Sequence, residues 1–423
     1  MATGLISSRK RGPSLSQRLP HALTTHLPDI SSLMTGLANS LSAHSSHLES
    51  ASEKGDITCW FLDTRSLWPG ARSGQDIWNA PQAADAMSLI SVSEQKTITG
   101  KMFIQDAKMS LGSALLKRLF ISQALDIPWS KVRLARKGDP KHGKPCAVDE
   151  VGRPIEGIDF NVSHQAGLVA LIGWNGKKRH RYAPNGSIEG FISPNTNFEP
   201  DVMVGVDIVC VNERDDYRTI DQEGLDGWVD IYDFVFSDEE RWTMKYDVDY
   251  ITLLDGTHLG REELGRHDRE IKRNKQISLT TPSGRDVTFN SDLLVEAKLR
   301  RFYTFFCYKE AYIKLAGEAL LAPWLKQLEF FNVRSPKPGV PARCSTHGQW
   351  GEQVDDVEVH MNGQEVVDVR MKIQAFEESF MVSTAIQGDI QGMKVPGFTK
   401  LDLRSEVLSY AHKHLDVSPS ERR

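Results

Sequence analysis

Two charged side chains stand four residues apart in a stretch with the pattern of a helix. Between residues 302 and 317 the apolar side chains recur at three- and four-residue spacing, as on a helix with one buried face. Glu310 and Lys314 would therefore project from the same face, so that a carboxylate and an ammonium group act at one place. Taken alone, the spacing also fits a surface ion pair worth about 0.3–0.5 kcal/mol.

A second carboxylate interrupts an apolar strand. Residues 202–209 alternate, with Val204 and Val206 on one face and Asp207 on the other. A carboxylate in so apolar a strand costs free energy unless it binds a cation or a hydrogen-bond donor. The sequence leaves open whether Asp207 is a metal ligand or makes a structural hydrogen bond.

Adjacent serine and histidine residues end another strand. Residues 158–164 alternate, and residues 165–167 would turn the chain into a second strand over 168–174. Ser163 and His164 then lie near the tip of a hairpin. Because neighbouring strand residues point to opposite faces, their adjacency does not make a nucleophile and its base, and the pair does not predict a hydrolase.

A strongly basic segment precedes this hairpin. Between residues 96 and 144, eleven lysines and arginines face three aspartates, a net charge of +8 in a chain whose total is −5. Such a local excess favours a polyanionic ligand, although a merely solvated basic surface is the alternative. The segment contains a predicted amphipathic helix over 106–120 and a turn at Gly143, Lys144 and Pro145.

Composition limits the class of protein. A chain of 423 residues, 40% hydrophobic and 25% charged, is ordinary for a soluble protein with two domains. No stretch approaches the roughly 18 apolar residues of a membrane span, and the net charge excludes a generally basic nucleic-acid binder. The five cysteines are scattered and odd in number, which indicates a reducing compartment and a cytoplasmic location.

The chain divides into four parts. Residues 1–55 are basic, Ser-rich and poor in acids, which favours a disordered tail over the alternative of a mitochondrial transit peptide. An N-terminal half over 56–200 ends in a loop-rich join from about residue 177. A C-terminal half over 201–390 includes a highly charged, solvated insertion at about 255–290, and 391–423 is a C-terminal extension.

Three stretches together resemble the monomeric Sfp-type 4′-phosphopantetheinyl transferases. They are FNVSHQ at 160–165, VGVDI at 204–208 and KEAYIK at 309–314. DAKMS at 106–110 and GEALLAPW at 317–324 are similar to the filamentous-fungal branch. Each motif is weak alone, but their order and spacing are specific and cover about residues 59–386, apart from the insertions.

The resemblance implies an α/β (α+β) fold of two similar α/β halves related by a pseudo-twofold axis, with coenzyme A in the cleft between them. It implies Mg²⁺-dependent transfer of the phosphopantetheine arm from coenzyme A to a serine of apo acyl, peptidyl and aryl carrier domains. Adenosine 3′,5′-bisphosphate would be released. A monomer is expected on the same ground. The alternative is a catalytically weakened coenzyme A-binding or carrier-docking protein.

The resemblance also assigns the chemistry at the centre of the site. Asp207 and Glu310 match the Mg²⁺ ligands, with Gln165 or water as the third. Lys314, with Lys309, would hold the transferring phosphate. Glu310 would also accept the proton of the carrier serine, directly or through a water molecule. Where bacterial members have a second acid, two residues after the strand aspartate, this chain has Val209.

Further residues match the contacts to coenzyme A. Ser163 and His164 correspond to residues that bind its phosphates. Lys101, Lys108 and Ser110 match the residues that contact the 3′-phosphate. Gly143, Lys144 and Pro145 match the turn that holds the adenine.

Overall fold

The computed structural model describes residues 56–139, 143–176, 181–182, 188–189, 201–211, 216–318, 322–339, 348–389 and 393–416. The predicted tail over 1–55, and almost all of the predicted join over 177–200, lie outside the described residues. Among the described residues, no helix has both the length and the apolar character needed to cross a membrane.

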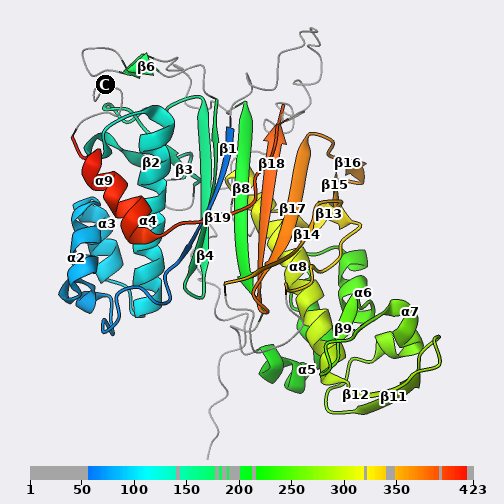
Figure 1. Ribbon diagram of the computed structural model, residues 1–423. Coiled ribbons are helices and arrows are strands. Elements are labelled where there is room, and N and C mark those ends of the chain that lie inside the picture. Colours follow the sequence, from blue (N-terminus) through cyan, green and yellow to red (C-terminus); the bar gives the residue numbers. More distant parts are fainter. Residues whose placement is uncertain are drawn as a thin grey trace, which may run out of the picture. The chain divides into compact units, whose positions relative to one another are not determined.

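The N-terminal half is a four-stranded sheet covered by helices (Figure 1). Its strand order is β19–β1–β5–β4, and β4 and β5 form the predicted antiparallel hairpin, in which Ile158 pairs with Asn175. The main elements are β1 (Asp56–Asp63), α2 (Pro81–Ser88), α3 (Val92–Thr99), α4 (Ile104–Leu125), β4 (Ile158–Gln165) and β5 (Leu168–Asn175).

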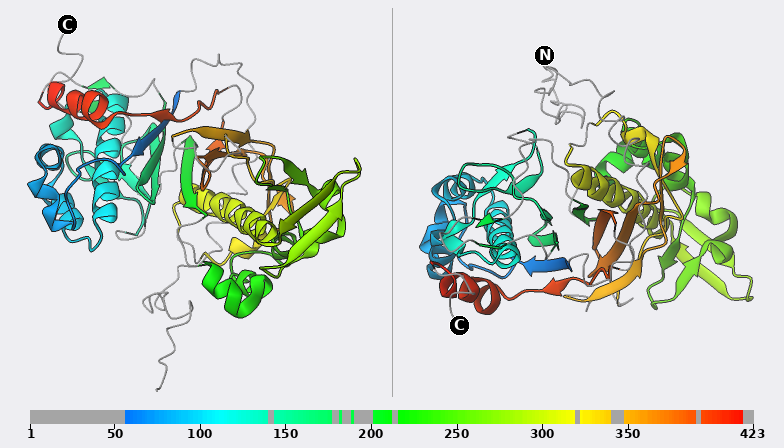
Figure 2. Two further views of the ribbon diagram at one scale, coloured as in Figure 1. Left: turned by 60° about the horizontal axis from the view of Figure 1, so that its bottom comes forward. Right: turned by 90° about the horizontal axis from the view of Figure 1, so that it is seen from above.

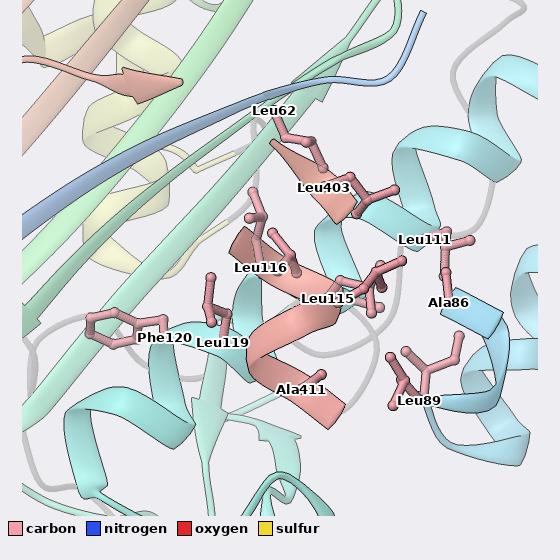
Figure 3. Close-up of a cluster of buried hydrophobic side chains, with 14 of the residues drawn as sticks. Leu62, Ala86, Leu89, Leu111, Leu115, Leu116, Leu119, Phe120, Leu403 and Ala411 are labelled. Atoms are coloured by element: carbon pink, nitrogen blue, oxygen red, sulfur yellow. The ribbon is translucent and has the colours of Figure 1, made fainter. Parts of the chain in front are cut away.

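Helix α4 forms the centre of the first hydrophobic core. It is longer than predicted from the sequence and is buried around most of its circumference. Figure 3 shows leucines of α4 in one cluster with Leu62 of β1 and with Ala86 and Leu89 at α2. Because so much of the helix is enclosed, its apolar residues exceed a single stripe, which is why its ends were poorly marked in the sequence.

The C-terminal half is a second four-stranded antiparallel sheet with one long helix against it. Its strand order is β14–β17–β18–β8. A Cβ atom at Gly205 would lie 2.2 Å from the carbonyl oxygen of Ala311 and 2.5 Å from the nitrogen of Leu315, so a glycine lets the helix lie directly on β8. The elements are β8 (Val202–Cys210), α8 (Asp292–Ala316), β14 (Trp350–Val354), β17 (Val369–Phe376) and β18 (Phe380–Gly388).

Each half thus combines a sheet with helices, in agreement with the α/β class. The pseudo-twofold relation between the halves stays a prediction.

Shorter elements lie between the main ones. They are η4 (Gln75–Asn79), η5 (Trp129–Lys131), β2 (Leu134–Arg136), β3 (Pro145–Ala147), β6 (Arg181–Tyr182), β7 (Ile188–Glu189), α5 (Asp216–Asp230), α6 (Asp238–Tyr246), η7 (Leu325–Gln327), β13 (Leu328–Phe331), β15 (Glu358–Met361) and β16 (Gln364–Glu365).

The charged insertion has regular structure and a small core of its own. Two hairpins and two short helical turns enclose an apolar cluster that includes Ile277, Val287 and Phe289. Short alternation within a highly charged sequence concealed these strands. The elements are β9 (Tyr250–Thr252), β10 (His258–Gly260), α7 (Arg261–Leu264), η6 (Gly265–Arg269), β11 (Gln276–Thr280) and β12 (Asp286–Asn290).

The last described segment belongs to the N-terminal half. β19 (Thr399–Lys400) pairs in parallel with β1, and η8 (Leu403–Leu408) and α9 (Ser409–Lys413) bury apolar side chains in the core around α4. Figure 2 shows this segment in red beside the helices of that half. The expectation of a separate extension from residue 391 is therefore corrected for the described residues 393–416: they complete the first core.

Candidate active site

A serine, an aspartate and a lysine meet where the two sheets approach each other. The Oδ1 atom of Asp207 accepts hydrogen bonds from the Ser163 hydroxyl at 2.9 Å and from the Lys314 ammonium group at 2.5 Å. Lys314 also donates to the Ser163 hydroxyl at 2.8 Å. The structure thus brings together three side chains that the sequence analysis assigned to separate motifs.

Each of the three residues is fixed by a different element. Ser163 lies near the end of β4, Asp207 in the middle of β8, and Lys314 in the last turn of α8. Gly205 permits the close packing of α8 on β8, and this packing carries Lys314 to the aspartate. The short, rigid side chain of a strand aspartate and the long side chain of a helical lysine can therefore meet.

The nearby carboxylates stabilise the positive charge of Lys314. Burial opposes the charge on Lys314, but the carboxylates of Asp207 and Glu310 outweigh it and raise the pKa of Lys314. The lysine is thus held in its charged form. Its side chain keeps 27% of its surface exposed, whereas that of Asp207 keeps only 6%, so the lysine is the more exposed residue of the pair.

Glu310 lies one helical turn before Lys314 and is partly exposed. Its charge acts on the pKa of Lys314 together with that of Asp207, so both carboxylates face the same region. Gln165, the last residue of β4, is also partly exposed. Across the described ranges, three or more histidine, cysteine or acidic side chains nowhere gather closely enough to hold a metal by themselves. The oxygen donors fit Mg²⁺ in chemical type, two carboxylates and an amide.

A cluster of cations acts on His164 at the hairpin tip, against the single opposing carboxylate of Asp106. The side chain is accessible to solvent, yet the protein around it and the neighbouring positive charges lower its pKa. These charges belong to Lys314, Lys101 and Lys117. The sequence singled out Lys101, but Lys117 of α4 could be identified only as one member of the basic segment.

We expect the neutral form of His164 to persist below the usual histidine pKa of about 6.5. An NMR titration of the free protein should give a lower midpoint, and addition of coenzyme A should raise it, because phosphate charges favour the imidazolium. A His164→Asn variant identifies the resonance. A midpoint at or above the usual value in the free protein would contradict this description of the site.

The first turns of α4 lie beside the same tip. The Met109 sulfur accepts a hydrogen bond from the Gly167 amide at 3.1 Å, and Lys108 and Ser110 flank this contact. Both flanking residues are partly exposed, and burial lowers the pKa of Lys108. Because residues two apart on a helix do not share a face, Lys108 and Ser110 cannot both point toward one phosphate in the same way.

Lys309 is not part of this group, which corrects the sequence prediction. Its side chain is 0% exposed, and its ammonium group pairs with Glu240 at 2.9 Å. It also donates to the backbone carbonyls of Leu325 and Leu328. With these acceptors and no surface exposure, Lys309 stabilises the packing of α8 against α6 and β13 and is not available to a phosphate.

Lys144 is also committed to a structural role. Its ammonium group forms a buried ion pair with Asp159 and donates to the Leu315 carbonyl at 3.4 Å. The predicted turn itself is present: a Cβ atom at Gly143 would lie 1.8 Å from the Lys137 carbonyl oxygen, so only glycine fits there. Of the three turn residues, Pro145 is partly exposed, Gly143 is buried, and the charge of Lys144 is already paired.

A basic surface beside a carboxylate–lysine pair is an arrangement suited to binding phosphate groups.

Comparison with known proteins identifies the family. Residues 78–175 match the model of the N-terminal region of 4′-phosphopantetheinyl transferases. A 4′-phosphopantetheinyl transferase of Aureobasidium melanogenum is 60% identical over 355 residues, which is 84% of this chain and 97% of the relative.

Two further fungal relatives agree. The 4′-phosphopantetheinyl transferase A of Aspergillus fumigatus is 35% identical over 78% of this chain and 83% of its own. The 4′-phosphopantetheinyl transferase NpgA of Emericella nidulans is 31% identical over 80% of this chain and 84% of its own. The chain therefore belongs to the 4′-phosphopantetheinyl transferase family, whose enzymes use coenzyme A as a substrate and modify carrier proteins.

Proposed function

We propose that this transferase carries out its reaction at the group formed by Ser163, Asp207 and Lys314. The observation that carries the proposal is the single oxygen of Asp207 that accepts from both Lys314 and Ser163. The acceptors we propose are serines of apo carrier domains of fatty acid synthase, polyketide synthase, nonribosomal peptide synthetase and aminoadipate reductase. The products are the holo carrier and adenosine 3′,5′-bisphosphate.

The residues divide between binding and reaction. The charged Lys314 binds the phosphate that is transferred, and its contact with Asp207 fixes the direction of its N–H donors. The cluster of Lys101, Lys117 and His164, with Lys108 and Ser110 on α4, receives the nucleotide phosphates. Pro145, the partly exposed residue of the turn that follows Gly143, contacts the adenine.

In the transfer itself, the oxygen of the carrier serine forms a bond to the phosphorus that bears the pantetheine arm. The bond from that phosphorus to the adenosine bisphosphate breaks, and the electron pair leaves with it. Glu310 takes the serine proton, directly or through a water molecule it holds. Lys314 neutralises the charge that develops on the phosphate oxygens.

Asp207, Glu310 and Gln165 are the side chains that would hold Mg²⁺, and their oxygen atoms suit this ion. When bound, Mg²⁺ neutralises the pyrophosphate charge and stabilises the leaving group. Val209 supplies no further carboxylate. We also propose that the protein is monomeric and cytoplasmic.

The proposal is tested by mass spectrometry of an apo acyl carrier protein incubated with this protein, coenzyme A and Mg²⁺. We expect a mass gain of about 340 Da on the serine, lost with EDTA. No gain on several carriers, with coenzyme A still bound, would favour the catalytically weakened coenzyme A-binding protein instead.

Glu310→Gln should reduce turnover by a factor of about 10²–10⁴, because the amide cannot take the serine proton. Carrier binding should be retained. A matched control is Glu296→Gln, the same change in the same helix about 21 Å along its axis from Glu310. Near-normal turnover in Glu310→Gln would remove Glu310 from the reaction.

A further inference from the structure

The two sheets meet through strands that are each at the edge of their own sheet. β4 ends the order β19–β1–β5–β4, and β8 ends the order β14–β17–β18–β8. β4 and β8 lie against each other without sharing backbone hydrogen bonds of a ladder. The backbone groups on the outer side of β8 therefore need partners other than a neighbouring strand.

Side chains at alternate positions of β4 provide these hydrogen-bond partners. The Oδ2 atom of Asp159 accepts from the Val204 amide at 2.9 Å, and the Oδ1 atom of Asn161 accepts from the Val206 amide at 3.4 Å. Two residues further, Ser163 donates to the Asp207 side chain at 2.9 Å. Alternate strand residues point to the same side, so these three side chains form one continuous row along β4.

The amides of Val204 and Val206 have no alternative partner in their own sheet. β18 pairs with β8 in antiparallel register, with Ser383 opposite Asp207 and Ala385 opposite Gly205. Amides along a strand point alternately to its two sides, so those of Val204 and Val206 point away from β18. Both valines are buried, and an amide left without an acceptor there costs about 1–3 kcal/mol.

Asn161 contacts the backbone next to Asp207 and the backbone of Lys314. Its Oδ1 atom receives the amide of Val206, which precedes Asp207, and its Nδ2 atom donates to the carbonyl of Lys314 itself at 3.5 Å. The assignment of oxygen and nitrogen in this amide follows from the two partners, one a donor and one an acceptor. The side chain is buried, so water does not compete for either bond.

We propose that Asp159 and Asn161 are positioning residues for the transfer reaction. By taking the place of a neighbouring strand, their side chains fix β8 and the end of α8 against β4. Asp207 and Lys314 are thereby held in register with Ser163. Asp159 extends the row to the basic turn through its ion pair with Lys144. The positioning role in catalysis rests on the proposed function, whereas the row of hydrogen bonds along β4 does not depend on it.

The first variant is Asn161→Leu, which keeps the size of the side chain and removes both hydrogen bonds. We expect kcat to fall about tenfold or more, while KM for the carrier stays within about twofold. The matched control is Asn175→Leu on the adjacent strand β5, because the buried Oδ1 atom of Asn175 accepts no hydrogen bond from the described residues. The control should keep its kcat. Equal kcat values for Asn161→Leu and the unaltered protein would overturn the positioning role.

Amide hydrogen exchange gives a readout that does not depend on activity. In Asn161→Leu, protection of the Val206 amide should fall at least about tenfold, while that of Gly205, which faces β18, is retained. Asn161→Asp keeps an acceptor for Val206 and should keep its protection, even if Asn161→Leu folds poorly.

The possible failures are separate. Unchanged protection of Val206 in Asn161→Leu, or lost protection in Asn161→Asp, would overturn the row of contacts. Absence of transfer by the unaltered protein would overturn the proposed function and the catalytic part of this inference, while the exchange result would still decide whether the row exists.

Discussion

Asp207→Asn is expected to lower the rate of phosphopantetheinyl transfer by about 10³-fold. Asparagine has nearly the same shape and can still accept the Ser163 hydroxyl, but it carries no charge. Lys314 then loses the partner that helps to raise its pKa and orient its ammonium group. The donor set proposed for Mg²⁺ also loses a carboxylate. The rate is measured by mass spectrometry of the carrier in single-turnover reactions.

The control for this result is Asp249→Asn. Asp249 also pairs with a cation, Arg301, at 2.6 Å, and it accepts from the Ser335 amide at 2.8 Å, but it lies outside the active-site group. This variant should lose stability and keep its transfer rate when folded. If Asp207→Asn transferred within about threefold of the unaltered protein, the reaction centre would have to lie elsewhere.

Lys309→Met should lower the free energy of unfolding by about 3–5 kcal/mol. The substitution leaves the buried carboxylate of Glu240 without its counter-charge, and the carbonyls of Leu325 and Leu328 without their donor. Glu240 keeps its hydrogen bonds from the amides of Ser237 and Phe330, which do not replace a cation. Urea unfolding, followed by circular dichroism, measures the loss.

A double variant that combines Lys309→Met with Glu240→Gln separates this explanation from a simple packing defect. Without either charge, part of the lost stability should return, because no unpaired buried charge remains. The return is incomplete, because Ser237 and Phe330 donate to different oxygens of Glu240 and the side-chain amide introduced at position 240 has only one acceptor oxygen. The affinity of folded Lys309→Met for coenzyme A, measured by calorimetry, should be unchanged. A large loss of affinity with normal stability would instead restore the phosphate-binding role first predicted for Lys309.

Local patterns predicted the elements that carry the site. Alternation predicted β4 and β8, and the turn at 165–167 predicted β5, each to within one residue of the observed ends, because the strands have largely apolar faces. Helix α6 begins at a capping box, in which Ser237 and Glu240 make both hydrogen bonds. Helix α8 begins ten residues earlier than predicted, because its first turns are charged and pack on the insertion rather than on the sheet.

The family could be predicted from the amino-acid sequence, because motif order and spacing are properties of the chain alone. Which of the two lysines on α8 lies beside Asp207 depends on how the helix packs, and the sequence did not predict it. Lys309 and Lys314 are five residues apart, which turns them about 140° from each other around the helix axis. Docking of α8 on β8 at Gly205 brings Lys314 to Asp207 and turns Lys309 toward Glu240.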